Sequence, residues 1–192
     1  MSTLQRAIEI ATEAHQGQLD KAGRDYIGHP LRVMEMGKTE NEKIVGVLHD
    51  VIEDSDWTFE KLAEEGFSDE VIAALKCVTK TSENENYDDF IDRVKKNPLA
   101  AAVKINDLTD NMDIRRLPYL SDKDVKRLKK YLKAYKRLTE SLSILYMLPN
   151  RRIPMLMILG QRRQTQNWQG CGLKESLWLI SLTTSDESTQ QL

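Results

Sequence analysis

The 192-residue sequence has few of the residues that build disulfide scaffolds or membrane spans. Its two cysteines, Cys77 and Cys171, lie far apart without a CxxC spacing, which argues against a disulfide framework and a cysteine-based zinc site. Apolar runs of bilayer-spanning length are lacking, and the first residues show no signal-peptide pattern. We therefore expect a protein of the reducing cytoplasm without a membrane partner.

An excess of positive charge is also lacking, because 28 Lys and Arg residues stand against 30 Asp and Glu residues. We therefore do not expect nucleic acid as a partner. The basic run between Lys123 and Arg137 is better explained as the solvated face of an amphipathic helix, since leucines and Tyr135 form the opposite stripe. Any phosphate chemistry must then come from a local site.

Helical patterns dominate the first 140 residues, whereas the alternating apolar pattern typical of strands is hard to find. Capping residues or first-turn prolines recur along this stretch as candidate helix starts. These positions are Ser2, Pro30, Thr39, Thr58, Ser68, Pro98 and Ser121. The pattern favours an all-α helical bundle.

The composition changes near residue 141, where charged residues become sparse and the amphipathic period is lost. The stretch from Thr183 to Gln191 is polar enough to predict disorder. We predict a helical domain over residues 1–140 and a compositionally distinct C-terminal tail over residues 141–192. We assign no chemistry to the tail.

All three histidines lie within the first 49 residues, and His49 begins the most distinctive polar pattern. On a helix, His49 and Glu53 are one turn apart, as are Asp50 and Asp54. Burying these groups in an otherwise apolar helix costs free energy unless a cation or hydrogen bonds compensate them. A bound metal ion is the economical explanation. We interpret His15 as a packing or orienting residue.

Two further residues complete a candidate ligand set, namely His29 near a helix start and Asp107 near the end of another helix. Two imidazoles and two aspartates suit Mn²⁺, Fe²⁺ or Zn²⁺ better than Mg²⁺ or Ca²⁺, which prefer oxygen ligands alone. Structural alternatives remain open at this point. His29 on its own could make a helix-start hydrogen bond, and Asp107 and Asp110 could be ordinary polar residues at a helix end.

Four ordered segments resemble the hydrolase motifs of the RelA/SpoT family. They are AHQGQ at 14–18, YIGHP at 26–30, LHDVIED at 48–54 and VKINDLTDNM at 103–112. The chain looks like a small stand-alone alarmone hydrolase of that family, similar to the metazoan SpoT homologue. The resemblance covers about residues 4–140 and implies the HD-domain helical bundle.

The resemblance also implies roles for individual residues. The family's metal ligands, usually for Mn²⁺, are matched by His29, His49, Asp50 and Asp107. Glu53 and Asp54 match its catalytic acidic pair, Lys21 a phosphate-binding residue and Asn111 a residue near the nucleotide. Family members remove the 3′-pyrophosphate from guanosine tetraphosphate or pentaphosphate, so we expect a metal-dependent phosphohydrolase with a nucleotide substrate of that type.

The chain departs from the family pattern around the phosphate site. Leu19 and Asp20 stand where two arginines are usual, and Leu108 and Asp110 replace a basic residue and an aromatic ring or histidine. The phosphate-binding surround is therefore expected to be less basic. The alternatives are an HD hydrolase of another nucleotide or phosphorylated cofactor, and a nucleotide-binding module without catalysis. The native metal and the oligomeric state stay open.

Overall fold

The computed structural model describes residues 2–82, 84–117 and 119–147, and these residues fold as helices. The elements are α1 (Leu4–Ala14), α2 (Gly28–Glu35), α3 (Glu40–Leu48), α4 (Val51–Asp54), α5 (Phe59–Glu64), α6 (Asp69–Val78), α7 (Tyr87–Lys95), α8 (Pro98–Asn111), a 3₁₀ turn (Ile114–Arg116) and α9 (Asp122–Met147). Within these ranges no strand forms, and the only β-pairing is an isolated bridge between Leu19 and Asp25. The predicted all-α fold is confirmed.

Side-chain caps begin several helices where the sequence predicted them. In each case a side-chain oxygen accepts the backbone N–H three residues later, at Thr39, Thr58, Ser68 and Ser121. The first cap is shifted by one residue. Thr3, rather than Ser2, accepts the N–H of Arg6, and the Ser2 N–H instead donates to the carbonyl of Gly66. The capping residues therefore predicted these helix starts to within one residue.

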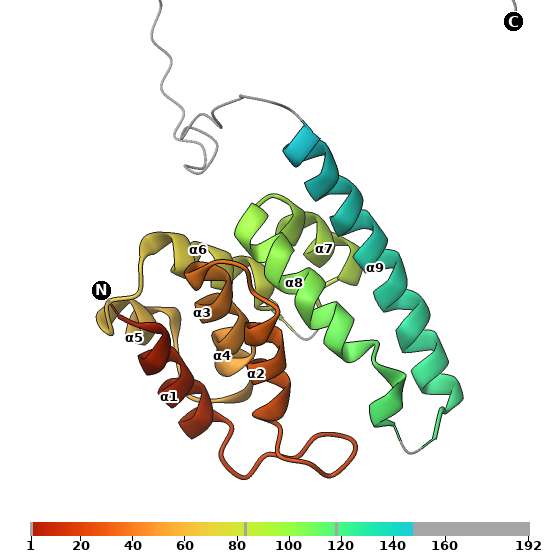
Figure 1. Ribbon diagram of the computed structural model, residues 1–192, viewed down its shortest axis with the longest axis horizontal. Helices are drawn as coiled ribbons and strands as arrows, with labels where there is room; N and C mark the ends of the chain where they lie inside the picture. The colour runs from red at the N-terminus through yellow and green to blue at the C-terminus, as the bar shows by residue number, and fades with distance from the viewer. Residues whose placement is uncertain (1, 83, 118, 148–192) are drawn as a thin grey trace, which may run out of the picture. The chain divides into compact units, whose positions relative to one another are not determined.

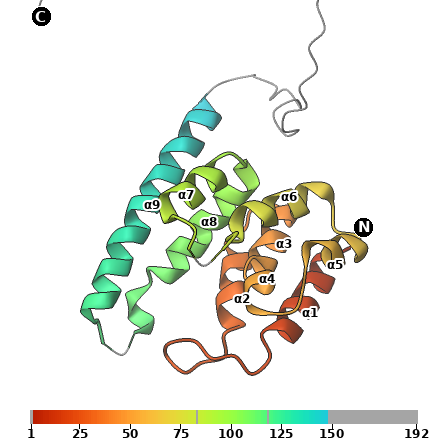
Figure 2. The same ribbon diagram turned by 180° about the vertical axis from the view of Figure 1, so that it is seen from behind.

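Helix α3 lies at the centre of the described bundle and packs against α1, α2, α6 and α8 (Figure 1). Residues 44–48 of α3 are buried without exception, as their apolar character predicted. Helix α9 runs beside α7 and α8, as both views show (Figure 2), and buries Ala134 and Leu138. The core thus packs α3, which ends just before His49, directly against α2 and α8, which carry His29 and Asp107.

The chain breaks its helix at His49, which the sequence pattern did not predict. Helix α3 ends at Leu48 and α4 begins at Val51. The His49 ring donates from Nδ1 to the carbonyl oxygen of Gly46 over 2.8 Å, and that carbonyl would accept the N–H of Asp50 in a continuous helix. The helical bond resumes from the Asp54 N–H to the Asp50 carbonyl at 3.1 Å. Asp50 and Asp54 therefore remain one turn apart, as predicted.

The predicted division at residue 140 falls within α9, which continues to Met147. Residues 148–192, most of the predicted tail, lie outside the described residues, so the division into 1–140 and 141–192 stays a prediction. In the part of the chain that the structure describes, every helix is too short or too polar to cross a bilayer.

Gly46 allows α2 and α3 to approach closely. A Cβ atom at this position would lie 3.2 Å from both the backbone N and the Cα of Met34, and 3.3 Å from the carbonyl oxygen of Val33. Backbone atoms within a helix cannot shift one at a time, so a side chain here would push the two helices apart. Gly46 therefore helps to set the separation between the helices that carry His29 and His49.

Replacing Gly46 by alanine tests this packing. At an exposed helical site the change to alanine stabilises a protein by about 1 kcal/mol, because glycine is a poor helix former. Because of the close contact with α2, we expect Gly46→Ala to lower the free energy of unfolding by about 1–3 kcal/mol, as overpacking does. Urea denaturation followed by circular dichroism measures this change. A rise in the free energy of unfolding would contradict the close approach.

Candidate metal centre

The four predicted metal ligands lie together, although they come from three separate segments. His29 belongs to the first turn of α2, His49 and Asp50 to the break between α3 and α4, and Asp107 to α8. Nε2 of His29 lies 3.2 Å from Oδ1 of Asp107 and 3.6 Å from Oδ2 of Asp50. Nε2 of His49 lies 3.1 Å from the same oxygen of Asp50 and 3.6 Å from that of Asp107. We call these four side chains the His-Asp cluster.

Both imidazoles of the His-Asp cluster direct Nε2 inward because a hydrogen bond holds Nδ1. Nδ1 of His49 points to the Gly46 carbonyl, and Nδ1 of His29 lies 2.6 Å from Oδ2 of Asp110. A carbonyl or an ionised carboxylate can only accept, so each Nδ1 carries the hydrogen. In a neutral imidazole with hydrogen on Nδ1, Nε2 offers a lone pair, which is the form that binds a metal.

The burial of the His-Asp cluster makes a cation at its centre favourable. His49 and Asp107 are only 3% and 4% exposed. Nε2 of His49 is buried and, among the described residues, makes no contact with hydrogen-bond geometry, even to Asp50. Each Nε2 thus lies 3.1–3.6 Å from one oxygen of Asp50 and one of Asp107. The ligand atoms of His29, His49 and Asp50 all lie within 4.8 Å of one another, while Asp107 contacts this group through the two imidazoles. Distances of about 3–3.5 Å also separate neighbouring ligands around an ion bound at 2.0–2.2 Å. The donor set therefore fits a divalent transition metal.

The pKa shifts of the cluster have the same physical origin. Burial lowers the pKa of His29 and of His49, but the neighbouring aspartates outweigh it and leave both pKa values above the usual range. Burial likewise raises the pKa of Asp50 and of Asp107, yet the imidazoles, and Lys104 for Asp107, hold both pKa values below the usual range. The carboxylates stay ionised and attract positive charge to this point. A metal ion supplies that charge by displacing protons from the imidazoles.

Three polar side chains hold the aspartates of the cluster, and the sequence analysis assigned none of them this role. The Tyr26 hydroxyl donates to Oδ2 of Asp50 over 2.6 Å. Nζ of Lys104 lies 2.7 Å from Oδ2 of Asp107, which leaves Oδ1 to face the imidazoles. The Asn111 amide donates to that Oδ1 over 2.6 Å, so this predicted nucleotide-binding residue contacts a predicted ligand. All three lie inside the motif segments, and this position in the sequence was the signal that could have pointed to a role at the site.

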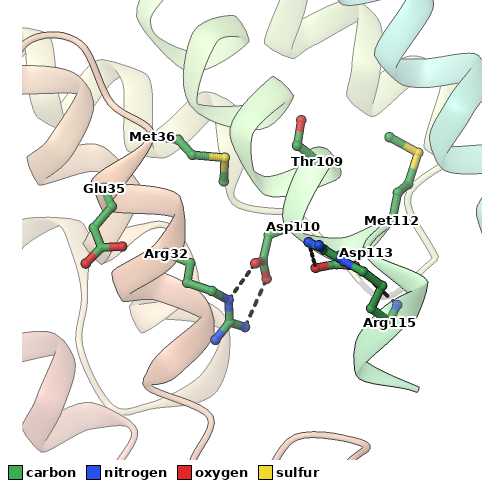
Figure 3. Close-up of a pocket in the computed structure, with 8 residues that line it drawn as sticks. All are labelled: Arg32, Glu35, Met36, Thr109, Asp110, Met112, Asp113 and Arg115. Carbon is green, nitrogen blue, oxygen red and sulfur yellow. Dashed lines mark hydrogen bonds and ion pairs between the residues drawn. The ribbon is translucent and has the colours of Figure 1, made fainter. Parts of the chain in front are cut away.

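Asp110 is the largest departure from its expected role as an ordinary residue at a helix end. Its side chain is buried, and it accepts hydrogen bonds from both His29 and Arg32. Figure 3 shows the fork formed by Arg32, in which Nε and Nη2 lie 2.6 and 3.1 Å from the two carboxylate oxygens. Arg116 adds a third cationic contact at 2.9 Å. Burial raises the pKa of Asp110, but these partners hold it below its usual range.

The predicted acidic pair lies at the end of α4. The apolar neighbours of Glu53 and Asp54 predicted that both are buried, and this is wrong, because both are exposed and water can solvate them. Oε1 of Glu53 accepts the backbone N–H of Lys80 over 2.8 Å, which orients its carboxylate. Partial burial and the charge of Asp50 raise the pKa of Asp54. The catalytic role of the pair stays a prediction.

A cavity of about 300 Å³ lies beside the His-Asp cluster, with His29 in its wall. Both predicted substrate-binding residues, Lys21 and Asn111, line it. Leu19 and Asp20, which depart from the family pattern, line it as well. Nη1 of Arg116 lies 3.8 Å from Oδ2 of Asp20. Arg116 and Arg127 add two guanidinium groups that the family motifs did not indicate. The lining therefore combines three cationic side chains with the carboxylates of Asp20 and Asp113.

Comparisons with known proteins match the same region of the chain. The chain is 34% identical over 128 residues to a probable GTP pyrophosphokinase of Mycobacterium leprae, covering 60% of this chain and 16% of that protein. It is 35% identical over 120 residues to a guanosine-3′,5′-bis(diphosphate) 3′-pyrophosphohydrolase of Aquifex aeolicus, covering 57% of this chain and 17% of that protein. The chain thus spans about a sixth of the length of these relatives. No family model matches it.

A solved structure has a similar fold. It is described as a metazoan orthologue of SpoT that hydrolyses ppGpp and plays a role in starvation responses. The superposition covers 77% of this chain and 98% of that chain, with a TM-score of 0.59 and 19% sequence identity. The expected resemblance is confirmed: the chain is a homologue of the RelA/SpoT-type hydrolase domain and shares the helical fold of the metazoan SpoT orthologue.

Proposed function

We propose that this protein is a metal-dependent phosphohydrolase that removes the 3′-pyrophosphate from guanosine tetraphosphate or pentaphosphate. The observation that carries the proposal is the convergence of the His-Asp cluster beside a cavity lined by Lys21, Arg116 and Arg127. Similarity to the 3′-pyrophosphohydrolase of A. aeolicus supports this choice of reaction. Hydrolysis of the bond between the 3′-oxygen and its phosphorus would yield GDP or GTP and pyrophosphate.

The four side chains of the His-Asp cluster would hold the metal ion. The mixed nitrogen and oxygen ligands suit Mn²⁺, Fe²⁺ or Zn²⁺, and Mn²⁺ is the proposed ion because it is usual in the family that the chain resembles. Such an ion supplies Lewis acidity, which polarises a phosphoryl oxygen and acidifies water. Lys104 and Tyr26 restrain the two aspartates through the contacts described above. The site therefore requires little rearrangement when it takes up the ion.

The acidic pair and the cavity would perform the remaining chemistry. Asp54 is suited to accept the proton of the attacking water. Its pKa is raised, and a carboxylate whose pKa lies closer to neutral pH is a stronger base. Glu53, which the Lys80 N–H holds in place, would orient that water. Lys21, Arg116 and Arg127 would bind phosphate oxygens, to which guanidinium groups can donate two parallel hydrogen bonds.

One feature of the cavity favours a second candidate substrate class. Asp20 lines it, with Oδ2 3.8 Å from Nη1 of Arg116, so the cavity has an acidic group where the family usually has an arginine. The alternative is an HD hydrolase of another nucleotide or of a phosphorylated cofactor. A further alternative is a nucleotide-binding module that keeps the metal and lacks catalysis.

Metal binding can be measured without any substrate. We expect isothermal titration of the metal-free protein with Mn²⁺ to show about one ion per chain. His49→Gln should weaken this binding by at least about 100-fold, since loss of a ligand costs more than loss of a residue that supports one. Asp113→Asn is the matched control, because Asp113 pairs with Arg115 and not with the cluster. Equal affinities for His49→Gln and wild type, or no binding by either, would refute the proposed site.

Hydrolysis is tested with guanosine tetraphosphate and Mn²⁺ by following GDP and pyrophosphate. We expect Asp54→Asn, which removes the proposed general base, to lower kcat by about 10²–10⁴-fold. Glu53→Gln, which removes the group proposed to orient the water, should also lower kcat. The control is Glu60→Gln, which changes an exposed glutamate of α5 and should leave kcat unchanged.

A panel of other nucleotides separates the alternatives. Turnover of another nucleotide, without turnover of either alarmone, would assign the second substrate class. Nucleotide binding that is equal in wild type and Glu53→Gln, with no phosphate or pyrophosphate released by either protein, would identify a non-catalytic module.

A further inference from the structure

Asp110 contacts the one cluster imidazole that has no backbone partner holding its outer nitrogen. Oδ2 of Asp110 lies 2.6 Å from Nδ1 of His29, on the edge of the ring opposite Nε2. For His49 the equivalent contact is the Gly46 carbonyl, which comes from the same chain segment and is independent of any other side chain. The orientation of His29 thus depends on a residue 81 positions away in the sequence.

Both oxygens of the Asp110 carboxylate already contact side-chain donors, so we do not count Asp110 as a further metal ligand. Nε of Arg32 lies 2.6 Å from Oδ1, while Nη2 of Arg32 and Nη2 of Arg116 lie 3.1 and 2.9 Å from Oδ2. Arg116 also donates to the Asp110 backbone carbonyl over 2.7 Å. Two guanidinium groups keep the carboxylate ionised and fix its plane. An anion held this firmly can accept only from a nitrogen that carries hydrogen.

We propose that Asp110 is a positioning residue, which fixes His29 as the tautomer with hydrogen on Nδ1 and so directs the Nε2 lone pair to the metal. This inference rests on the proposed metal site. A free neutral histidine exchanges between two tautomers, and only the form with hydrogen on Nδ1 can bind a metal through Nε2. Carboxylates that accept the second N–H of a ligating histidine commonly change metal affinity 10–100-fold. Asp110 would have that effect through His29 alone.

The tautomer can be observed directly in metal-free protein. Long-range ¹H–¹⁵N spectra of protein labelled at its histidines, recorded at a pH where both imidazoles are neutral, distinguish hydrogen on Nδ1 from hydrogen on Nε2. In wild type we expect hydrogen on Nδ1 in both His29 and His49. In Asp110→Asn we expect the fraction of His29 with hydrogen on Nε2 to rise, because the amide oxygen that Arg32 and Arg116 would keep at the position of Oδ2 is neutral and a weaker acceptor than a carboxylate. His49 should not change, and it serves as the internal reference.

Metal affinity provides the second measurement. We expect Mn²⁺ to bind Asp110→Asn about 10–100-fold more weakly than wild type. The matched control is Asp92→Asn, which removes the carboxylate charge from an ion pair with Arg137 away from the cluster, and it should stay within about threefold of wild type. A similar loss in both variants would show that the effect is not specific to the carboxylate that contacts His29 and would overturn the proposal.

The outcomes separate this inference from the proposed function. If wild-type His29 carries its hydrogen on Nε2, the inference fails even if Asp110→Asn does not fold. If Asp110→Asn folds with the wild-type tautomer and affinity, the inference fails as well. If wild type takes up no metal, the proposed function fails, while the tautomer of His29 still decides whether Asp110 fixes the ring.

Discussion

Two imidazole nitrogens and two carboxylate oxygens face one another in this protein, and the rest of the site is arranged to hold them in that position. Nε2 of His29 and of His49 each lie within 3.6 Å of one oxygen of Asp50 and one of Asp107. Because Nδ1 of each ring is held by an acceptor, the neutral imidazoles bring no hydrogen to the centre. Such an arrangement in a buried place is favourable only with positive charge inside it. A divalent cation is the charge that this ligand set suits.

The fold keeps these donors together by packing three segments against one another. Helix α3 is buried among α1, α2, α6 and α8, and Gly46 lets α2 come close. The helix then breaks at His49, where the imidazole takes a carbonyl that the backbone would otherwise use. Lys104, Tyr26 and Asp110 hold the outer atoms of the ligands. The core and the polar network thus impose the same geometry, which is typical of a preorganised site.

Local signals in the sequence predicted the parts of this structure that depend on neighbouring residues. Caps such as Thr39 and Ser68 act within one turn of helix, so their residue types suffice to find them. The ligand set was predicted from residue chemistry and motif resemblance, and the structure brings all four side chains together. The break at His49 was missed because an apolar period does not reveal that a side chain takes a backbone carbonyl. Asp110 was missed because its partners His29 and Arg32 lie 81 and 78 residues away.

The surface of the site was the least predictable part, because it too depends on how residues far apart in the sequence are brought together. Glu53 and Asp54 looked buried beside apolar neighbours, but the short α4 exposes them. Arg116 lies outside every motif, and the fold brings it to the cavity beside Asp20.

A crystal structure of the Mn²⁺-loaded protein, with the metal located by anomalous scattering, tests the central claim most directly. The account predicts one peak about 2–2.4 Å from Nε2 of both histidines and from oxygens of Asp50 and Asp107. A peak elsewhere, or none, would contradict it.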